Sequence, residues 1–207
     1  MKRVVTAQDI PAGGELRVPV GTIVTASAHE TAAARGVRIV ELPEEQLSAL
    51  APAERTVAIG SDHGGFRMKE CLRPVLEGLG LSVRDIGVYE EKPADYPDIA
   101  LKVAELVASG AAARGVIVDG AGIGSSIAAN KVPGIRAALC YDKASARNSR
   151  EHNDSNVLTL GGRMLTETQA EDVLRTWVGT PFGGGRHQAR IQKILDIEKQ
   201  YLKKASS

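Results

Sequence analysis

From residue 55 onward, short apolar runs alternate with longer segments in which apolar residues recur at intervals of three and four positions. The short runs are almost continuously apolar, which is typical of strands that are buried on both faces. They predict five strands, at 56–59, 81–86, 116–118, 135–140 and 157–160. Helical patterns follow the strands, including one through about residue 79, one at 97–109 and a last one from 186 to about 203. This alternation indicates an α/β fold with a five-stranded parallel sheet covered on both faces.

Residues 1–54 show a different pattern, with two short β-like runs, a small alanine-rich helix and an exit rich in proline and glutamate. A segment of this length is too short to bury a large core alone. We therefore predict a small N-terminal extension, an arm or mini-domain, at 1–54 with a linker near 43–55. The main domain is predicted at 55–207.

Composition narrows the possible partners. Aromatic residues make up only 3% of the chain, so stacking platforms for nucleic acid are not expected. The net charge of +1 provides no global field for polyanions or membranes. We therefore expect no nucleic-acid partner and no membrane partner, and any anion site must be local.

Cysteine and histidine usage does not predict a metal site. Cys71 and Cys140 have no ligand spacing and form no disulfide framework, which suits a reducing cytosol. The four histidines show no HxH or HxxxH pair.

No apolar stretch approaches 18 residues, and the N-terminus lacks the apolar core of a signal peptide. The sequence predicts a cytoplasmic protein without a metal or cofactor.

Two carboxylates stand at the predicted ends of strands. Asp62 lies in the segment SDHGG just beyond the first strand, and Asp119 ends the third apolar run. Ligands of open α/β sheets bind beyond the carboxyl ends of the strands. We therefore expect a ligand site where these two residues lie.

A glycine loop follows Asp119, with Gly120, Gly122 and Gly124 before a predicted helix. Backbone N–H groups in such a loop suit an anion. Two other interpretations remain open, a tight turn and a dinucleotide site with Asp142 on a ribose. The spacing GxGxG, instead of GxGxxG, and the position after the third strand count against the dinucleotide.

Asp119 itself has two interpretations. A strand-end aspartate often caps the next helix. A partly desolvated carboxylate can also remove a proton from a carbon next to a carbonyl, while neighbouring amides stabilise the enediolate that forms. Both roles stay open from the residues alone.

Further polar clusters lie at other loop positions. His63 stands in SDHGG, which a capped turn also explains, and His152 and Asn153 precede the last strand in REHNDSN. Arg186 and Arg190 are four residues apart and so share one helical face, which is often merely solvated. Guanidinium groups also suit a phosphate monoester, and without a Walker loop a sugar phosphate is favoured over ATP.

Together, five segments resemble the family of type B ribose-5-phosphate isomerases and galactose-6-phosphate isomerase subunits. They are GSDHGGFRMKE, DYPD, GAGIGSSIAANKVPGIRAALC, ARNSREHNDSNVLTLGGRM and GGGRHQARI, in family order and spacing. The resemblance covers residues 56 to about 200. It implies a Rossmann-like three-layer α/β/α fold, metal-free and nucleotide-free aldose–ketose isomerisation, and a homodimer or tetramer whose active sites combine residues from two subunits.

The resemblance also implies roles for single residues. His152 opens the sugar ring, Asp62 assists at the sugar hydroxyls, and Asn153 helps to hold the enediolate. The remaining implied contacts are the anion-hole amides of residues 120–124 (among them Gly120, Ala121, Gly122 and Gly124), the phosphate clamp (His63, Arg163, Arg186, Arg190), Tyr96 in the sugar pocket and Ser125 as a further substrate contact.

Three loop positions depart from the family pattern. Many members have a cysteine base at the position of Asp119, others use a glutamate at that of Ser125, and a hydroxyl residue is common at that of Ala121. Asp119 is then the one plausible base in this loop. The departures leave two functions open: an isomerase for ribose 5-phosphate or another four- to six-carbon sugar phosphate, and a non-catalytic binder of sugar phosphates.

The arm resembles a short segment of proteins associated with bacterial microcompartments, carried by GTIVTASAHETAAARGVRIVE. This resemblance implies recruitment to a microcompartment as a shell or cargo partner. A simpler interpretation is an extension that stabilises a dimer.

Overall fold

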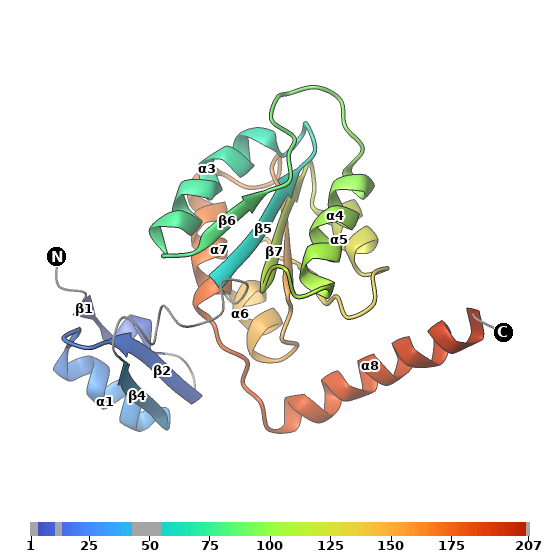
Figure 1. The fold of residues 1–207 in the computed structure, drawn as a ribbon. Coiled ribbons are helices and arrows are strands. Elements are labelled where there is room, and N and C mark those ends of the chain that lie inside the picture. Colours follow the sequence, from blue (N-terminus) through green and yellow to red (C-terminus); the bar gives the residue numbers. More distant parts are fainter. Residues whose placement is uncertain (1–3, 11–13, 43–54, 206–207) are drawn as a thin grey trace.

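A five-stranded parallel sheet forms the centre of the main domain in the computed structural model, which describes residues 4–10, 14–42 and 55–205 (Figure 1). Its strands are β5 (Thr56–Ser61), β6 (Ser82–Asp85), β7 (Arg114–Asp119), β8 (Ala137–Leu139) and β9 (Val157–Gly161). They pair in the order β6-β5-β7-β9-β8, and every pairing is parallel. The predicted five-stranded parallel sheet is confirmed.

Helices cover both faces of this sheet, which confirms the three-layer α/β/α fold. They are α3 (Phe66–Gly78), α4 (Tyr96–Ala108), α5 (Ile123–Ala129), α6 (Lys143–Glu151) and α7 (Glu167–Gly179). The last helix, α8 (Arg186–Ala205), extends away from the sheet (Figure 1). Helices α4 and α5 lie on one face, and α3 and α7 lie on the other. Within the described ranges, no helix is long and apolar enough to span a membrane.

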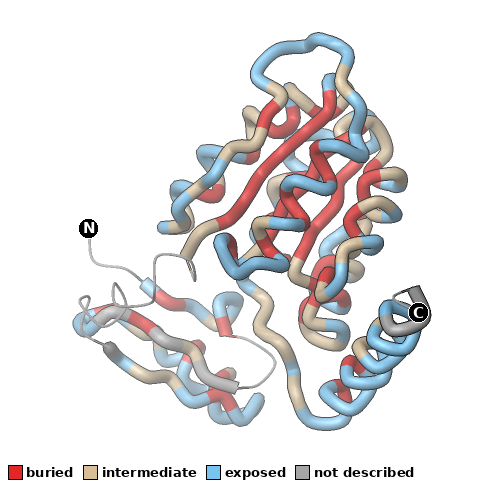
Figure 2. Tube along the Cα trace, turned by 45° about the vertical axis from the view of Figure 1, so that its right-hand side comes forward, coloured by how far each residue is buried: buried red, intermediate tan, exposed pale blue. Residues whose placement is uncertain are grey.

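The core follows from the two-residue period of each strand. In β7, Val116 and Val118 face the cluster that contains Trp177 of α7, whereas Ile117 between them faces the cluster that contains Val103 of α4. All three strand residues are fully buried, and Figure 2 shows the same burial along the central strands. Burial on both faces explains why these strands are continuously apolar.

Strand boundaries differ from the prediction by a few residues. β5 extends to Ser61 and β7 to Asp119, because the two strands pair up to Ser61 and Val118. β8 is shorter than predicted, because the N–H of Ile135 donates to Val132 in a turn. The extensions place polar residues directly at the carboxyl edge of the sheet.

The N-terminal arm contains more strands than the sequence pattern predicts. Its described residues, 4–10 and 14–42, form four short strands instead of two: β1 (Val4–Val5), β2 (Gly14–Pro19), β3 (Ile23–Val24) and β4 (Val37–Leu42), with η1 (Ala7–Asp9) and α1 (Ala26–Ala34). They form two parallel pairs, β1 with β3 and β2 with β4. β1 and β3 have two residues each, too few for an alternating pattern to reveal. Residues 43–54 of the linker predicted near 43–55 lie outside the described residues.

Deleting residues 1–54 is expected to leave a folded domain. The apolar cluster of the arm contains only arm residues, among them Val5, Ile10 and Ala28, and both clusters of the main sheet contain only residues beyond 56. Circular dichroism and thermal unfolding of the truncated chain test this expectation. Aggregation of the truncated chain would show instead that the arm covers surface of the main domain or of an interface.

Candidate active site

The strand order creates a switch point at the carboxyl edge of the sheet. β5 pairs with β6 on one side and with β7 on the other. The chain therefore leaves β5 toward one side of the sheet to form β6, and then crosses to the other side of β5 to form β7. Crevices at such points bind ligands in open α/β sheets. Asp62 follows β5 and Asp119 ends β7, and these residues are only 8% and 5% exposed. Two buried carboxylates therefore flank the switch point.

Asp119 caps the glycine loop. Its Oδ1 accepts the N–H of Ala121 at 2.8 Å and that of Gly122, and its Oδ2 accepts the N–H of Ser125 at 2.9 Å. Gly122, which precedes α5, has a φ of 79°, a left-handed conformation that glycine adopts readily. A carboxylate has about four acceptor positions, and these three bonds use about three of them. Two of the predicted anion-hole amides, those of Ala121 and Gly122, donate to Asp119 in this structure.

Three loops meet around this carboxylate. A Cβ on Gly64, in the loop after β5, would lie 3.3 Å from the backbone of Gly120. The loop after β9 joins them, because the N–H of Gly162 donates to the carbonyl of Asp119 at 2.7 Å and that of Arg163 to Gly120 at 3.1 Å. The glycines thus permit the close approach of the loops.

The pKa of Asp62 is raised above its ordinary value. Burial raises the pKa of Asp62, the N–H of Gly65 opposes this by donating to Oδ1 at 2.9 Å, and the charge of Asp119 raises the pKa further. The two carboxylates therefore interact electrostatically. A raised pKa suits Asp62 for exchanging protons with hydroxyl groups.

Other predicted residues lie at the same edge. The exposed ring of Tyr96 covers Gly124, where an added Cβ would come within 2.5 Å of it, and a Cβ on Gly120 would lie 3.8 Å from Arg163. His63 accepts the N–H of Ala94 at 3.4 Å, next to a pocket of about 570 Å³ between the 86–94 loop and α4. We call this group the carboxyl-edge cluster: Asp62, His63, Tyr96, Asp119, Gly120, Ala121, Gly122, Gly124, Ser125 and Arg163.

The sequence prediction missed Tyr141. Its hydroxyl donates to the carbonyl of Ala121 at 2.6 Å, so it supports the glycine loop from the side of β8. The available signal was its position, directly after the apolar run 135–140 and hence at the same edge as Asp119.

The remaining predicted residues lie at the opposite edge of the sheet. The backbone carbonyl of Asn153 accepts a hydrogen bond from Nε of Arg136 at 3.1 Å, and that of Asn156 accepts the N–H of Gly115, near the start of β7. Strands rise about 3.3 Å per residue, so the five residues of β9 separate the two edges by about 16 Å. Together with His187, which the sequence analysis did not single out, these residues form a second group that we call the amino-edge cluster: His152, Asn153, Arg186, His187 and Arg190. One chain does not bring His152 and Asn153 together with Asp62 and Asp119.

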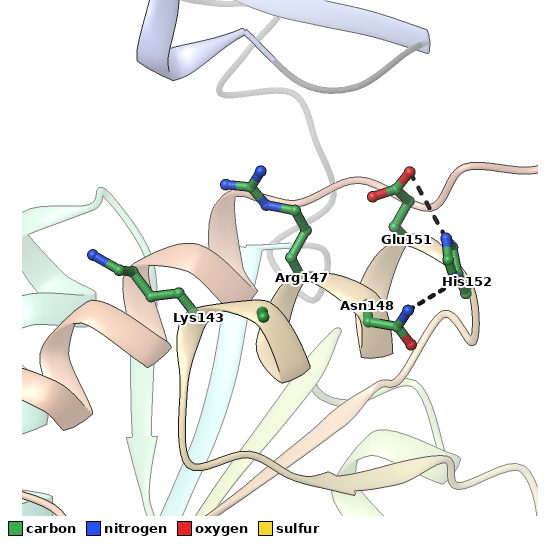
Figure 3. Close-up of a pocket in the computed structure, with 6 residues that line it drawn as sticks. Lys143, Arg147, Asn148, Glu151 and His152 are labelled. Atoms are coloured by element: carbon green, nitrogen blue, oxygen red, sulfur yellow. Dashed lines mark hydrogen bonds and ion pairs between the residues drawn. The ribbon is translucent and has the colours of Figure 1, made fainter.

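Two stacked imidazole rings lie at the centre of the amino-edge cluster. The rings of His152, after α6, and His187, on α8, are stacked with centroids 4.2 Å apart and an angle of 9° between their planes. A surface pocket of about 380 Å³ runs along α6 to His152, and Figure 3 shows the contacts of this ring with Asn148 and Glu151. Its lining residues are Lys143, Ala144, Arg147, Asn148, Glu151 and His152. Among the described residues, no group of three or more potential ligands gathers at a metal-binding distance.

A parallel α/β sheet with buried carboxylates at its switch point defines an α/β protein built to bind a small molecule. The model of the Ribose/Galactose Isomerase family matches residues 57–194, and the chain belongs to this family. The resemblance read from the sequence motifs is thereby confirmed.

Individual relatives agree with this assignment. Ribose-5-phosphate isomerase B of Escherichia coli (strain K12) is 41% identical over 146 residues, which cover 70% of this chain and 98% of that protein. A solved structure of Clostridium thermocellum ribose-5-phosphate isomerase B has a TM-score of 0.69 and 50% identity, and the match covers 70% of this chain and 99% of that chain. The D-erythrulose-4-phosphate isomerase of Pectobacterium atrosepticum is 36% identical over 148 residues, covering 70% of this chain and 96% of that protein.

Proposed function

We propose that the protein interconverts an aldose phosphate and a ketose phosphate, with ribose 5-phosphate and ribulose 5-phosphate as the favoured pair. The observation that carries this proposal is the pair of buried carboxylates, Asp62 and Asp119, at the switch point of the sheet. Membership of the chain in the Ribose/Galactose Isomerase family supports it. A coupled assay for ribulose 5-phosphate formation tests it. Binding of ribose 5-phosphate without turnover would favour the second candidate, a non-catalytic sugar-phosphate binder.

The proposed reaction has two stages. In ring opening, the protonated imidazole of His152 gives its Nε2 proton to the ring oxygen as the bond between this oxygen and C1 breaks, and the imidazole is left neutral. Asp62 takes the proton of the anomeric hydroxyl. In isomerisation, Asp119 takes the C2 proton and returns it to C1, while the hydroxyl proton moves from O2 to O1. Asn153 and the loop amides hold the enediolate between these transfers.

A second subunit completes the proposed site. Asp62 and Asp119 lie at the carboxyl edge of the sheet, whereas His152 and Asn153 lie at the amino edge. A homodimer, alone or within a tetramer, can place the amino-edge cluster of one subunit against the carboxyl-edge cluster of the other. Each site would then close its phosphate clamp with His63 and Arg163 from one side and Arg186 and Arg190 from the other.

The identity of the sugar is part of the proposal. A four-carbon substrate is the alternative, because a relative with 36% identity is named D-erythrulose-4-phosphate isomerase. Comparing kcat/KM for five-carbon and four-carbon sugar phosphates decides between them.

Arg190→Ala is expected to weaken binding of the phosphorylated substrate by about 1.5–3 kcal/mol, the range for charge-assisted hydrogen bonds. Arg190 is exposed on the first turns of α8, one turn from Arg186. Lys199→Ala is the matched control, because it removes an exposed cation from the opposite face of the same helix. An unchanged KM in the Arg190 variant, or an equal rise in both variants, would contradict the clamp.

The arm and the location of the protein complete the proposal. We place the enzyme in the cytoplasm, with the arm at 1–54 as a tag for a bacterial microcompartment. Fusion of residues 1–54 to a fluorescent reporter is expected to concentrate the reporter at compartments in cells that build them. A diffuse reporter would leave the arm as an extension that stabilises the oligomer.

A further inference from the structure

The imidazole ring of His187 stacks against one face of the imidazole ring of His152. The two rings are nearly parallel and 4.2 Å apart. The side chain of His152 is 36% exposed at the end of α6, whereas His187 is only 8% exposed on the first turn of α8. A buried ring therefore provides a flat, fixed surface for a partly exposed one.

Polar contacts fix the remaining freedom of His152. Nδ2 of Asn148 lies 2.9 Å from Nδ1 of His152. Because an amide nitrogen only donates, Nδ1 is the acceptor in this contact when the ring is neutral, and the proton of the neutral ring is then on Nε2. Nε2 in turn lies 4.0 Å from a carboxylate oxygen of Glu151. His187 thus sets the plane of the ring, and Asn148 sets its rotation within that plane.

His187 is poorly placed to exchange protons itself. Its Nδ1 is buried and has no hydrogen-bond partner within the described part of the chain. Burial lowers the pKa of His187, and the neighbouring His152 and the two arginines of the same helix turn lower it further, against the opposing charge of Glu151. His187 is therefore neutral near pH 7, and a neutral ring stacks on His152 without charge repulsion.

We propose that His187 is a positioning residue for ring opening: its ring holds His152 so that the Nε2 proton meets the ring oxygen of a cyclic sugar phosphate. The proposal rests on the proposed isomerase function, with His152 as the group that opens the ring. Under this proposal α8 has two roles, because His187 lies between Arg186 and Arg190 in this helix. The two arginines bind the phosphate, and His187 positions the ring of His152.

Two substrates separate ring opening from isomerisation. Ribose 5-phosphate closes into a five-membered ring through O4. A four-carbon aldose 4-phosphate cannot form this ring, because its O4 carries the phosphate. A defect in ring opening therefore slows the reaction of the first sugar and spares that of the second.

The test compares His187→Leu, which removes the flat ring, with His187→Phe, which keeps it. We expect His187→Leu to lower kcat for ribose 5-phosphate by about ten- to hundredfold, the cost of misplacing a reacting group, with little change in KM. Its kcat for erythrose 4-phosphate should stay within about twofold of wild type, and His187→Phe should keep about half or more of the wild-type kcat for both sugars. Asn148→Ala disturbs the same ring without touching α8, and we expect the same selective loss on ribose 5-phosphate.

Equal losses on both sugars in His187→Leu would overturn the proposal, as would an unchanged kcat for ribose 5-phosphate. An equally large loss in His187→Phe would overturn it too. The ¹⁵N spectrum of the imidazoles gives an independent readout: we expect one Nε2–H tautomer of His152 in the wild type and a mixture in His187→Leu. If the wild type turns over neither sugar, the proposed function fails, and this spectrum alone decides whether His187 controls the state of His152.

Discussion

Mixing Asp119→Asn chains with His152→Gln chains is expected to restore about a quarter of the wild-type activity from two variants that are each nearly inactive. Random reassociation makes half of the dimers mixed. In a mixed dimer one site carries both substitutions and the other carries neither, so one site in four is intact. The measurement is the turnover of ribose 5-phosphate after the two variants are unfolded together and refolded.

The physical reason is the position of the two clusters in one chain. Asp119 accepts the amides of its own loop at the carboxyl edge of the sheet, whereas the stacked ring of His152 stands near the start of the strands. Neither residue can reach the other within a chain, because the length of the sheet separates them. Restoration of activity therefore requires that each site draw on two subunits.

A pair of variants from the same cluster provides the control. Mixing Asp119→Asn with Asp62→Asn places one altered carboxyl-edge cluster in every site, so no activity should return. If both mixtures stay inactive while mass spectrometry shows mixed dimers, the shared site is wrong. If Asp119→Asn with Asp62→Asn regains activity, the two residues belong to different sites.

Much of the main domain was predictable from the sequence. Strands buried on both faces are continuously apolar, so Val116–Val118 identify a central strand and Asp119 its end. The separation of the clusters follows from the same pattern, because His152 precedes a strand whereas Asp62 follows one. In a parallel sheet these positions lie at opposite edges.

Loop conformation was not predictable in the same way. The three bonds that Asp119 accepts depend on the path of a seven-residue segment, and the sequence left both a cap and a base open. Tyr141 and the stacking of His187 on His152 depend on contacts between elements that are distant along the chain. The two-residue strands of the arm, β1 and β3, carry too few residues for any periodic signal.

Asp119→Asn on its own is expected to lower kcat at least about 10²-fold with little change in KM. The amide has the size of the carboxylate but cannot accept the C2 proton. The structure adds a second cause, because an asparagine offers one oxygen and one N–H₂ group where the carboxylate accepts three N–H groups. The loss can therefore arise from the missing base or from a displaced loop.

Asp119→Cys separates these two causes. A thiol is a weak acceptor and loses the contacts to Ala121, Gly122 and Ser125, but it can still take a proton once it ionises. If Asp119 is the base, the cysteine variant keeps measurable activity, which rises with pH as the thiol ionises near its ordinary pKa of about 8.5. If the contacts to the loop are what matter, the cysteine variant is at least as inactive as the asparagine variant at every pH.

Exchange of the C2 proton with deuterated solvent is the direct measurement, because it reports proton abstraction whether or not the product is released. We expect exchange to fall with kcat in Asp119→Asn and to return in part in Asp119→Cys. Exchange that continues undiminished in Asp119→Asn would assign the base to another group. Asp62 is the second buried carboxylate of the carboxyl-edge cluster and the next candidate. Asp119 would then serve only to hold the amides of the glycine loop in place.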